Sequence, residues 1–60
     1  MKQIIFTLSR NSWTIVAAAK SLLVDEEDRY IEANKPIFTV MSELTTKYNE
    51  RNIAVLFEID

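Results

Sequence analysis

Two hydrophobic periods meet within residues 36–60, and this change constrains the fold more than any other feature of the sequence. Five apolar residues recur at the spacing that lines one face of a helix: Ile37, Val40, Met41, Leu44 and Tyr48. Across the polar link 49–52 the apolar residues begin to alternate, as they do in a β-strand: Ile53, Val55, Phe57 and Ile59. The sequence therefore predicts an amphipathic helix over about 36–49 and a strand over about 53–59.

The position of Pro36 leaves two ways to begin this helix. Tyr30 and Ala33 lie in phase with the apolar stripe, so one long helix from about Glu26 could continue through a kink at the proline. An interior proline costs ~3 kcal/mol, whereas proline is favoured in the first turn. The simpler interpretation is a helix that begins at Pro36, with Arg29 to Ala33 forming a short strand or turn.

Residues 2–8 have the alternation of a strand. One face carries Ile4, Phe6 and Leu8, and the other carries Gln3, Ile5 and Thr7. The polar residues 9–12 should turn the chain. Because residues 53–57 are apolar on both faces, we expect that strand to be covered on both sides or to lie centrally in a sheet that continues across a dimer.

Residues 12–24 can be read in two ways. As a helix they place Ile15, Val16 and Ala19 on one arc, whereas as a strand they form a hairpin with residues 2–8. Helix is the preferred interpretation, although the acidic run that follows would oppose its dipole. Either way the fold class is α+β: one domain over 1–60, in which a small sheet (strands about 2–8 and 53–59, with a further strand within 12–33 left open) packs against the helix at about 36–49.

Composition excludes several classes of chemistry. The chain has no Gly, so positions with positive φ must use Asn, and the candidates are Asn11, Asn34, Asn49 and Asn52. The lack of Gly also removes glycine-rich phosphate loops. With no His and no Cys, Ser-His and Cys-His catalytic arrangements and the common zinc sites are excluded. We expect no enzymatic activity, no cofactor and no metal.

Size and charge suggest how the chain associates. A chain of 60 residues buries only about 60% of its unfolded surface, so oligomerisation is a common remedy and we expect a homodimer. A net charge of −2 argues against a phosphate-backbone binder. No apolar run approaches the ~18 residues of a membrane span, so we expect a cytoplasmic protein.

The candidate protein interface combines an acidic run with large apolar residues. Asp25 could cap a helix whose first turn holds the other acids, and a solvated helix start is preferred over a Mg²⁺ or Ca²⁺ site. The same run could instead imitate nucleic-acid phosphates and inhibit a nuclease or polymerase. Trp13 either seals one end of the core, as we prefer, or forms a binding hot spot. The candidate residues are Trp13, Asp25, Glu26, Glu27, Asp28, Tyr30, Ile31 and Phe38.

A strand followed by two helices, the preferred interpretation of residues 1–49, resembles the ribbon-helix-helix DNA-binding dimers. The resemblance implies that Gln3, Ile5 and Thr7 would face the major groove. An acidic inter-helix segment and an additional strand at 53–59 depart from that family. We therefore treat DNA binding as the alternative, and expect a small regulatory or inhibitory protein that binds another protein, as many phage and accessory-gene products do.

Overall fold

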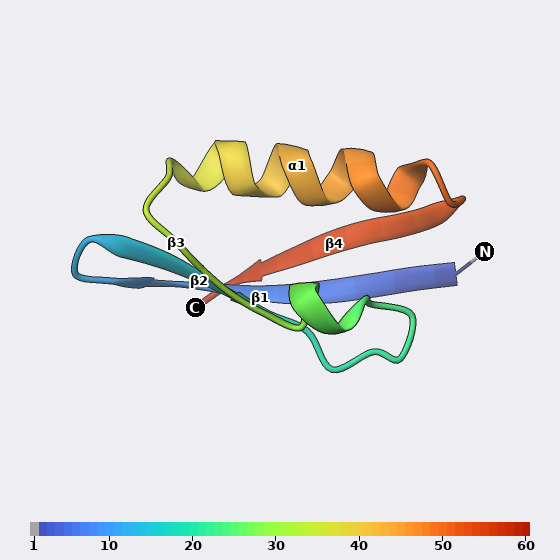
Figure 1. The fold of residues 1–60 in the computed structure, drawn as a ribbon, viewed down its shortest axis with the longest axis horizontal. Coiled ribbons are helices and arrows are strands. Elements are labelled where there is room, and N and C mark those ends of the chain that lie inside the picture. Colours follow the sequence, from blue (N-terminus) through green and yellow to red (C-terminus); the bar gives the residue numbers. More distant parts are fainter. Residues whose placement is uncertain (1) are drawn as a thin grey trace.

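The computed structural model describes residues 2–60 as an α+β fold of two layers (Figure 1). A four-stranded mixed sheet has the strand order β3-β2-β1-β4. One α-helix packs against it, and a short 3-10 helix precedes β3. The bounds are β1 (Lys2–Asn11), β2 (Thr14–Ala18), η1 (Glu26–Asp28), β3 (Tyr30–Ala33), α1 (Ile37–Asn49) and β4 (Ile53–Ile59).

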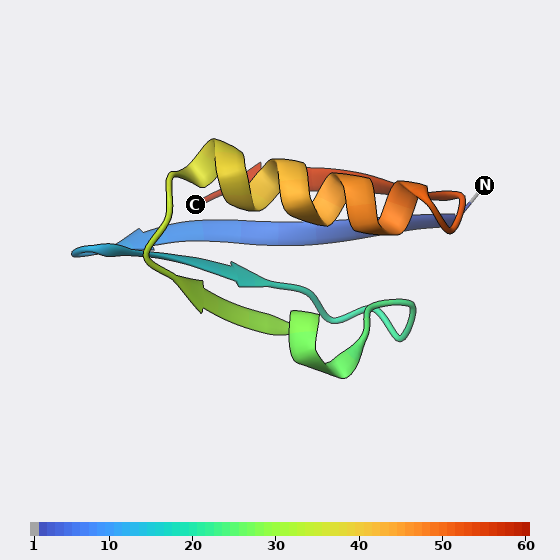
Figure 2. The same cartoon turned by 45° about the horizontal axis from the view of Figure 1, so that its top comes forward.

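The strands at the two ends of the sequence, β1 and β4, are neighbours in the sheet. β1 pairs with β4 in parallel and with β2 in antiparallel orientation, while β3 pairs antiparallel with the other side of β2. Figure 2 shows the four strands side by side, with α1 in front of the β1 and β4 side. The prediction that residues 2–8 and 53–59 share one sheet is confirmed, and pairing with β2 extends β1 to Asn11.

The core lies between α1 and one face of the sheet. The predicted alternation in β1 is confirmed, because Ile4, Phe6 and Leu8, which share one face of the strand, are all buried. The ring of Phe6 lies 6.0 Å from that of Phe57 and 6.2 Å from that of Tyr48, measured between centroids. The helical stripe is confirmed as well: Val40, Leu44 and Tyr48 are buried, and Ile37 and Met41 pack against the core.

The other face of the sheet is uncovered within one chain. Ile5 and Leu56 are register partners on this face, and they are 46% and 48% exposed. β4 is also an edge strand. The expectation that residues 53–57 are covered on both faces, or central in a sheet, is therefore not met by a single chain.

The preferred helix at residues 12–24 is wrong, and the hairpin is right. Thr14, Ile15 and Val16 are β-branched and suit a strand, and β2 gains a complete partner in β1. After Ala18 the chain leaves the sheet as a loop that reaches η1. A helix here would have ended against four acidic residues, which is unfavourable for its dipole.

Turns are built without glycine. Among residues 2–60 only Ser12, with φ of 48°, and Asn52, with φ of 62°, take positive φ. Asn52 was a candidate for this conformation and is confirmed, whereas at the hairpin Ser12 takes it in place of Asn11. Asn34 and Asn49, also candidates, do not.

Pro36 opens the helix and does not kink it. It lies immediately before α1 with φ of −58° and ψ of 143°, one position ahead of the first helical residue. Its carbonyl oxygen accepts hydrogen bonds from the backbone N–H groups of Thr39 and Val40, at 3.0 and 3.3 Å. The short strand expected between Arg29 and Ala33 is present as β3.

Candidate functional site

The turn between β1 and β2 carries the tryptophan. Asn11 and Thr14 are register partners, so Ser12 and Trp13 form a two-residue turn at the end of the hairpin. Trp13 is 87% exposed. The preferred interpretation, that this side chain seals the core, is therefore wrong.

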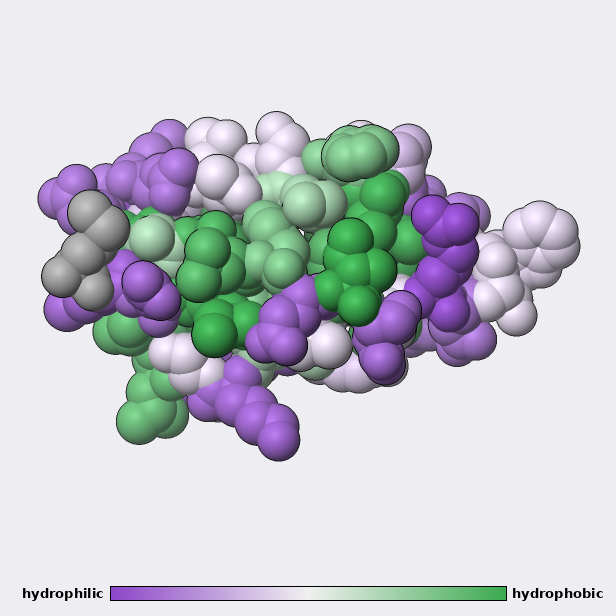
Figure 3. Space-filling model, turned by 180° about the vertical axis from the view of Figure 1, so that it is seen from behind, coloured by the Kyte–Doolittle hydropathy of each residue, from purple (hydrophilic) through white to green (hydrophobic). Residues whose placement is uncertain are grey.

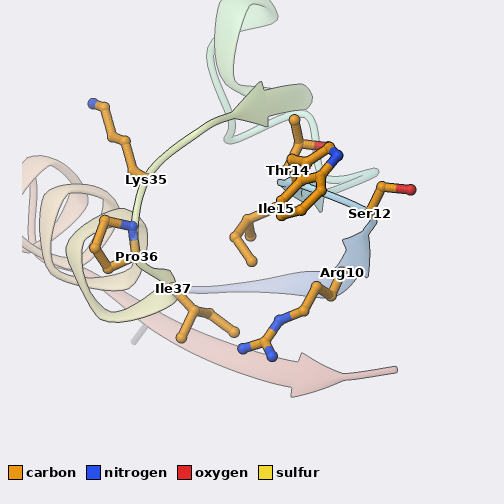
Figure 4. A pocket seen from close by; sticks show the side chains of 8 residues that line it. Arg10, Ser12, Thr14, Ile15, Lys35, Pro36 and Ile37 are labelled. Atoms are coloured by element: carbon orange, nitrogen blue, oxygen red, sulfur yellow. The ribbon is translucent and has the colours of Figure 1, made fainter.

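A hollow of about 250 Å³ lies between this turn and the start of α1. Figure 4 shows Ile15 and Ile37 facing the same space from β2 and α1, with Arg10 beside Ile37. Lys35 extends away from this space, and its ammonium group pairs with Glu43 at 3.0 Å. The lining residues are Arg10, Ser12, Trp13, Thr14, Ile15, Lys35, Pro36 and Ile37.

Arg10 and Ile37 belong to a second hollow as well, of about 340 Å³, at the end of β4. Its other lining residues are Leu8, Ser9, Ile59 and Asp60. Arg10 is exposed and makes no ion pair of 4.0 Å or less within residues 2–60. This end of the molecule thus offers two adjoining, partly apolar hollows beside an available positive charge.

The acidic run has a different surrounding. Arg51 donates two hydrogen bonds to the carboxylate of Asp25, at 2.9 and 2.8 Å. The hydroxyl of Tyr48 donates to Asp28 at 2.6 Å and accepts from the backbone N–H of Asp25 at 3.0 Å. Lys47 also donates to Asp28. These five residues, which we call the ion-pair cluster, fasten the loop before β3 to the C-terminal end of α1.

The electrostatics of the ion-pair cluster follow from these contacts. The guanidinium of Arg51 lowers the pKa of Asp25 to about 2, with help from Lys47. Hydrogen bonding to Asp28 raises the pKa of Lys47, and hydrogen bonding to Asp25 raises that of Arg51. Burial and the hydrogen bond to Asp28 raise the pKa of Tyr48. The charged forms of Asp25, Lys47 and Arg51 are therefore favoured near neutral pH.

Carboxylate oxygens of Asp25, Glu27 and Asp28 lie within 4.8 Å of one another, close enough to hold a metal ion. The ammonium of Lys47 lies against all three, at 3.3 Å from Asp25 and 3.7 Å from Glu27 in addition to its hydrogen bond with Asp28. The lysine supplies the positive charge that such a group of acids requires. Nothing in this arrangement favours a metal over the lysine.

The remaining interface candidates lie on different surfaces. Tyr30 is exposed on the open face of the sheet, Phe38 is 77% exposed on α1, and Ile31 packs against the core. Glu26 and Glu27 are exposed, whereas Asp28 is buried. Tyr30, Ile31 and Phe38 therefore do not form one continuous apolar patch.

The face proposed for DNA contact is exposed but acidic. Gln3, Ile5 and Thr7 are exposed there, and strand alternation adds Glu32 and Glu58 to the same face. No Lys or Arg of residues 2–60 occupies a strand position on it. Residues 2–60 also contain a single α-helix, so the strand-helix-helix order that the resemblance implied is not present.

Sequence reasoning missed three of the five members of the ion-pair cluster as functional groups: Lys47, the hydroxyl of Tyr48, and Arg51. A signal was present, because two cations four residues apart flank a tyrosine whose buried hydroxyl needs a partner.

Comparison with known protein families, curated proteins and solved structures yields no match for this chain. None of the helices within residues 2–60 has both the length and the apolar character needed to span a membrane.

Proposed function

We propose that the protein is a non-catalytic, cytoplasmic regulator or inhibitor that acts as a homodimer and binds another protein at the end of the molecule around Trp13. The observation that carries this proposal is the 87% exposure of Trp13 beside two partly apolar hollows. Tryptophan is enriched among the residues that contribute most to protein–protein binding. An exposed tryptophan contributes little to the fold of its own chain, so a partner supplies a physical reason for its position.

The chemistry of this end suggests the partner segment. Ile15, Pro36 and Ile37 provide apolar walls, and Arg10 provides a cation that forms no ion pair of 4.0 Å or less within residues 2–60. An apolar side chain next to a carboxylate would use both features. We therefore propose that the partner presents an apolar and acidic segment to this surface.

The imitation of nucleic acid has less support than protein binding at Trp13. Three of the four acids in the run, Asp25, Glu27 and Asp28, form ion pairs with Arg51 or Lys47. A phosphate mimic needs its charges available to a basic surface. DNA binding has less support still, because the exposed face of Gln3 and Thr7 carries acids in place of bases.

The test compares Trp13→Ser with a matched control, Leu22→Ser. Leu22 is 89% exposed in the loop after β2, away from the hairpin turn. Each tagged variant is used for quantitative capture from a lysate of the organism that encodes the chain, after circular dichroism has established an unchanged fold. We expect Trp13→Ser and Arg10→Glu to lose a partner that wild type and Leu22→Ser retain. Equal capture by all four proteins would refute the assignment of this surface.

A further inference from the structure

The outer edge of β4 has no strand beside it within residues 2–60. One side of β4 pairs with β1 along the whole strand without a bulge, and the sheet order places the other side at the edge. Six of its seven residues are apolar, and it contains neither Lys nor Pro. Proteins that remain monomeric usually protect an edge with charged side chains (especially Lys), Pro, a bulge or a covering segment. This edge has no Lys, Pro or bulge, and its one charged residue, Glu58, lies next to the end of the strand.

α1 contributes an exposed apolar side chain, that of Phe38, on the side of the β4 edge. Phe38 and Lys47 are nine residues apart, which places them on opposite sides of the helix at 100° per residue. Lys47 faces η1, which adjoins β3 at the far edge of the sheet. Phe38 therefore faces the β4 edge, where Ile59 is 70% exposed. Figure 3, seen from behind, shows hydrophobic side chains gathered along the middle of the molecule.

The two ends of this edge are complementary to each other. The exposed Phe38 and Ile59 lie at the C-terminal end of β4. A hollow of about 230 Å³ lies at the N-terminal end of β4, lined by Asn49, Asn52, Ile53 and Ala54. A two-fold axis brings each end of a surface against the opposite end of its copy. Protruding apolar side chains at one end and a hollow at the other suit such an axis.

We propose that a second copy of this chain pairs with the β4 edge, β4 against β4 in antiparallel orientation, about a two-fold axis at Leu56. This register uses all seven residues of β4. It sets Leu56 opposite Leu56, Val55 opposite Phe57, and Ile53 opposite Ile59. Ile59 then approaches the hollow beside Ile53 of the partner subunit, and this contact occurs twice.

This register brings no like charges into direct opposition. The single charged residue of β4, Glu58, lies opposite Ala54, so no like charges meet directly across the axis. The result is one eight-stranded sheet with both helices on the same face. On the open face, Ile5 and Leu56 of the two copies form one continuous apolar row across the interface. This arrangement would explain why β4 is apolar on both faces.

The test uses position 56 against position 5, its register partner. Leu56 and Ile5 are on the same face and nearly equally exposed, but only Leu56 is on the edge strand. Leu56→Lys would place two ammonium groups across the axis, so we expect dimerisation at least about tenfold weaker by analytical ultracentrifugation. Ile5→Lys should remain dimeric. A monomeric wild type at high micromolar concentration, or equal loss in both variants, would overturn β4 pairing.

Cysteine cross-linking provides a second readout that does not depend on weakening the dimer. The chain has no Cys, so Leu56→Cys introduces a single thiol. Opposed residues in an antiparallel pair have Cβ atoms about 4.5–5.5 Å apart, near enough for a disulfide after small adjustment. Mild oxidation should link Leu56→Cys into a covalent dimer and leave Ile5→Cys monomeric on a non-reducing gel. Preferential linking of Ile5→Cys would show that the open faces stack instead.

This inference rests on the homodimer of the proposed function but not on Trp13. Capture of a partner and self-association are measured separately, so either can fail alone. If Trp13→Ser loses no partner while Leu56→Cys cross-links, the partner surface is wrong and the dimer stands. If Trp13→Ser loses its partner while Leu56→Cys does not cross-link, the β4 pairing is wrong and the partner surface stands.

Discussion

Asp25 and Asp28 belong to a run that looks like solvated surface, yet both have structural partners. The hydroxyl of Tyr48 is the central group, since it accepts from the backbone of Asp25 and donates to the carboxylate of Asp28. A buried tyrosine hydroxyl without partners would be costly. The cations of Lys47 and Arg51, whose charges lie 5.6 and 5.2 Å from the centre of the Tyr48 ring, complete its surroundings. The loop is therefore held by the residue that closes one end of the core.

The lowered pKa of Asp25 predicts a specific loss of stability in acid. A carboxyl group whose pKa falls from 3.8 to about 2 on folding contributes stability above pH ~4, and that contribution disappears as pH falls through about 2. The free energy of unfolding, measured by urea titration at a series of pH values, should fall over this interval for wild type. Asp25→Asn should show a shallower fall there.

A matched control for this effect is Glu26→Gln. Glu26 is adjacent in sequence, is exposed, and forms no ion pair of 4.0 Å or less within residues 2–60. Its pH profile should follow that of wild type. If Asp25→Asn and wild type lose stability in parallel between pH 4 and 2, the pair with Arg51 does not stabilise the fold.

At the scale of elements, hydrophobic periodicity predicted the helix and the strands that are long enough to repeat their apolar pattern several times. The helix at residues 37–49 and the strand at 53–59 were located within a residue at each end, and the core face of β1 was correct. β2 has only five residues, and Ile15, Val16 and Ala19 fit a helix as well as a strand. Pairing with β1 decides between them, and local sequence does not contain that information.

The candidate surfaces were less predictable for a related reason. Asp25 and Arg51 are 26 residues apart, so their pairing depends on how the loop and α1 meet in three dimensions. Exposure of Trp13 likewise follows from the hairpin, which was the less favoured interpretation of that segment. The unprotected edge of β4 becomes visible only when the strand order is known.

The hairpin turn predicts a stabilising substitution. Ser12 adopts φ of 48°, a conformation that costs an L-amino acid roughly 1–2 kcal/mol and glycine almost nothing. After the greater flexibility of unfolded glycine is subtracted, Ser12→Gly should stabilise the protein by about 0.5–1 kcal/mol. Thermal denaturation would detect this as a rise of roughly 2–8 °C in a chain of this size.

Thr14→Gly, two residues later, is the matched control. Thr14 lies in β2 without positive φ, so glycine there should destabilise by roughly 0.5–1 kcal/mol. Opposite signs at two positions of one turn distinguish backbone strain from a general effect of glycine. A loss of stability in Ser12→Gly would contradict the strain argument.

At the scale of the whole molecule, stability depends on one core with one covered sheet face. A 60-residue domain is expected to have a free energy of unfolding of roughly 3–9 kcal/mol. Apolar cover comes from a single helix of 13 residues. Each buried side chain of α1 therefore accounts for a large share of the free energy of unfolding. The chain has no disulfide that could compensate when such a side chain is removed.

Leu44 is the side chain at which this dependence is best tested. It lies at the middle of the buried face of α1, so Leu44→Ala should cost about 2–5 kcal/mol through lost burial and a residual cavity, a loss comparable to the entire stability. Thr46→Ala changes an exposed position of the same helix and should cost nothing or add slightly to stability, since Ala is the better helix former. Urea unfolding followed by circular dichroism measures both. A loss below about 1 kcal/mol for Leu44→Ala would mean that the contact between α1 and the sheet is not the main source of stability, because burial of that size cannot be removed from a well-packed core so cheaply.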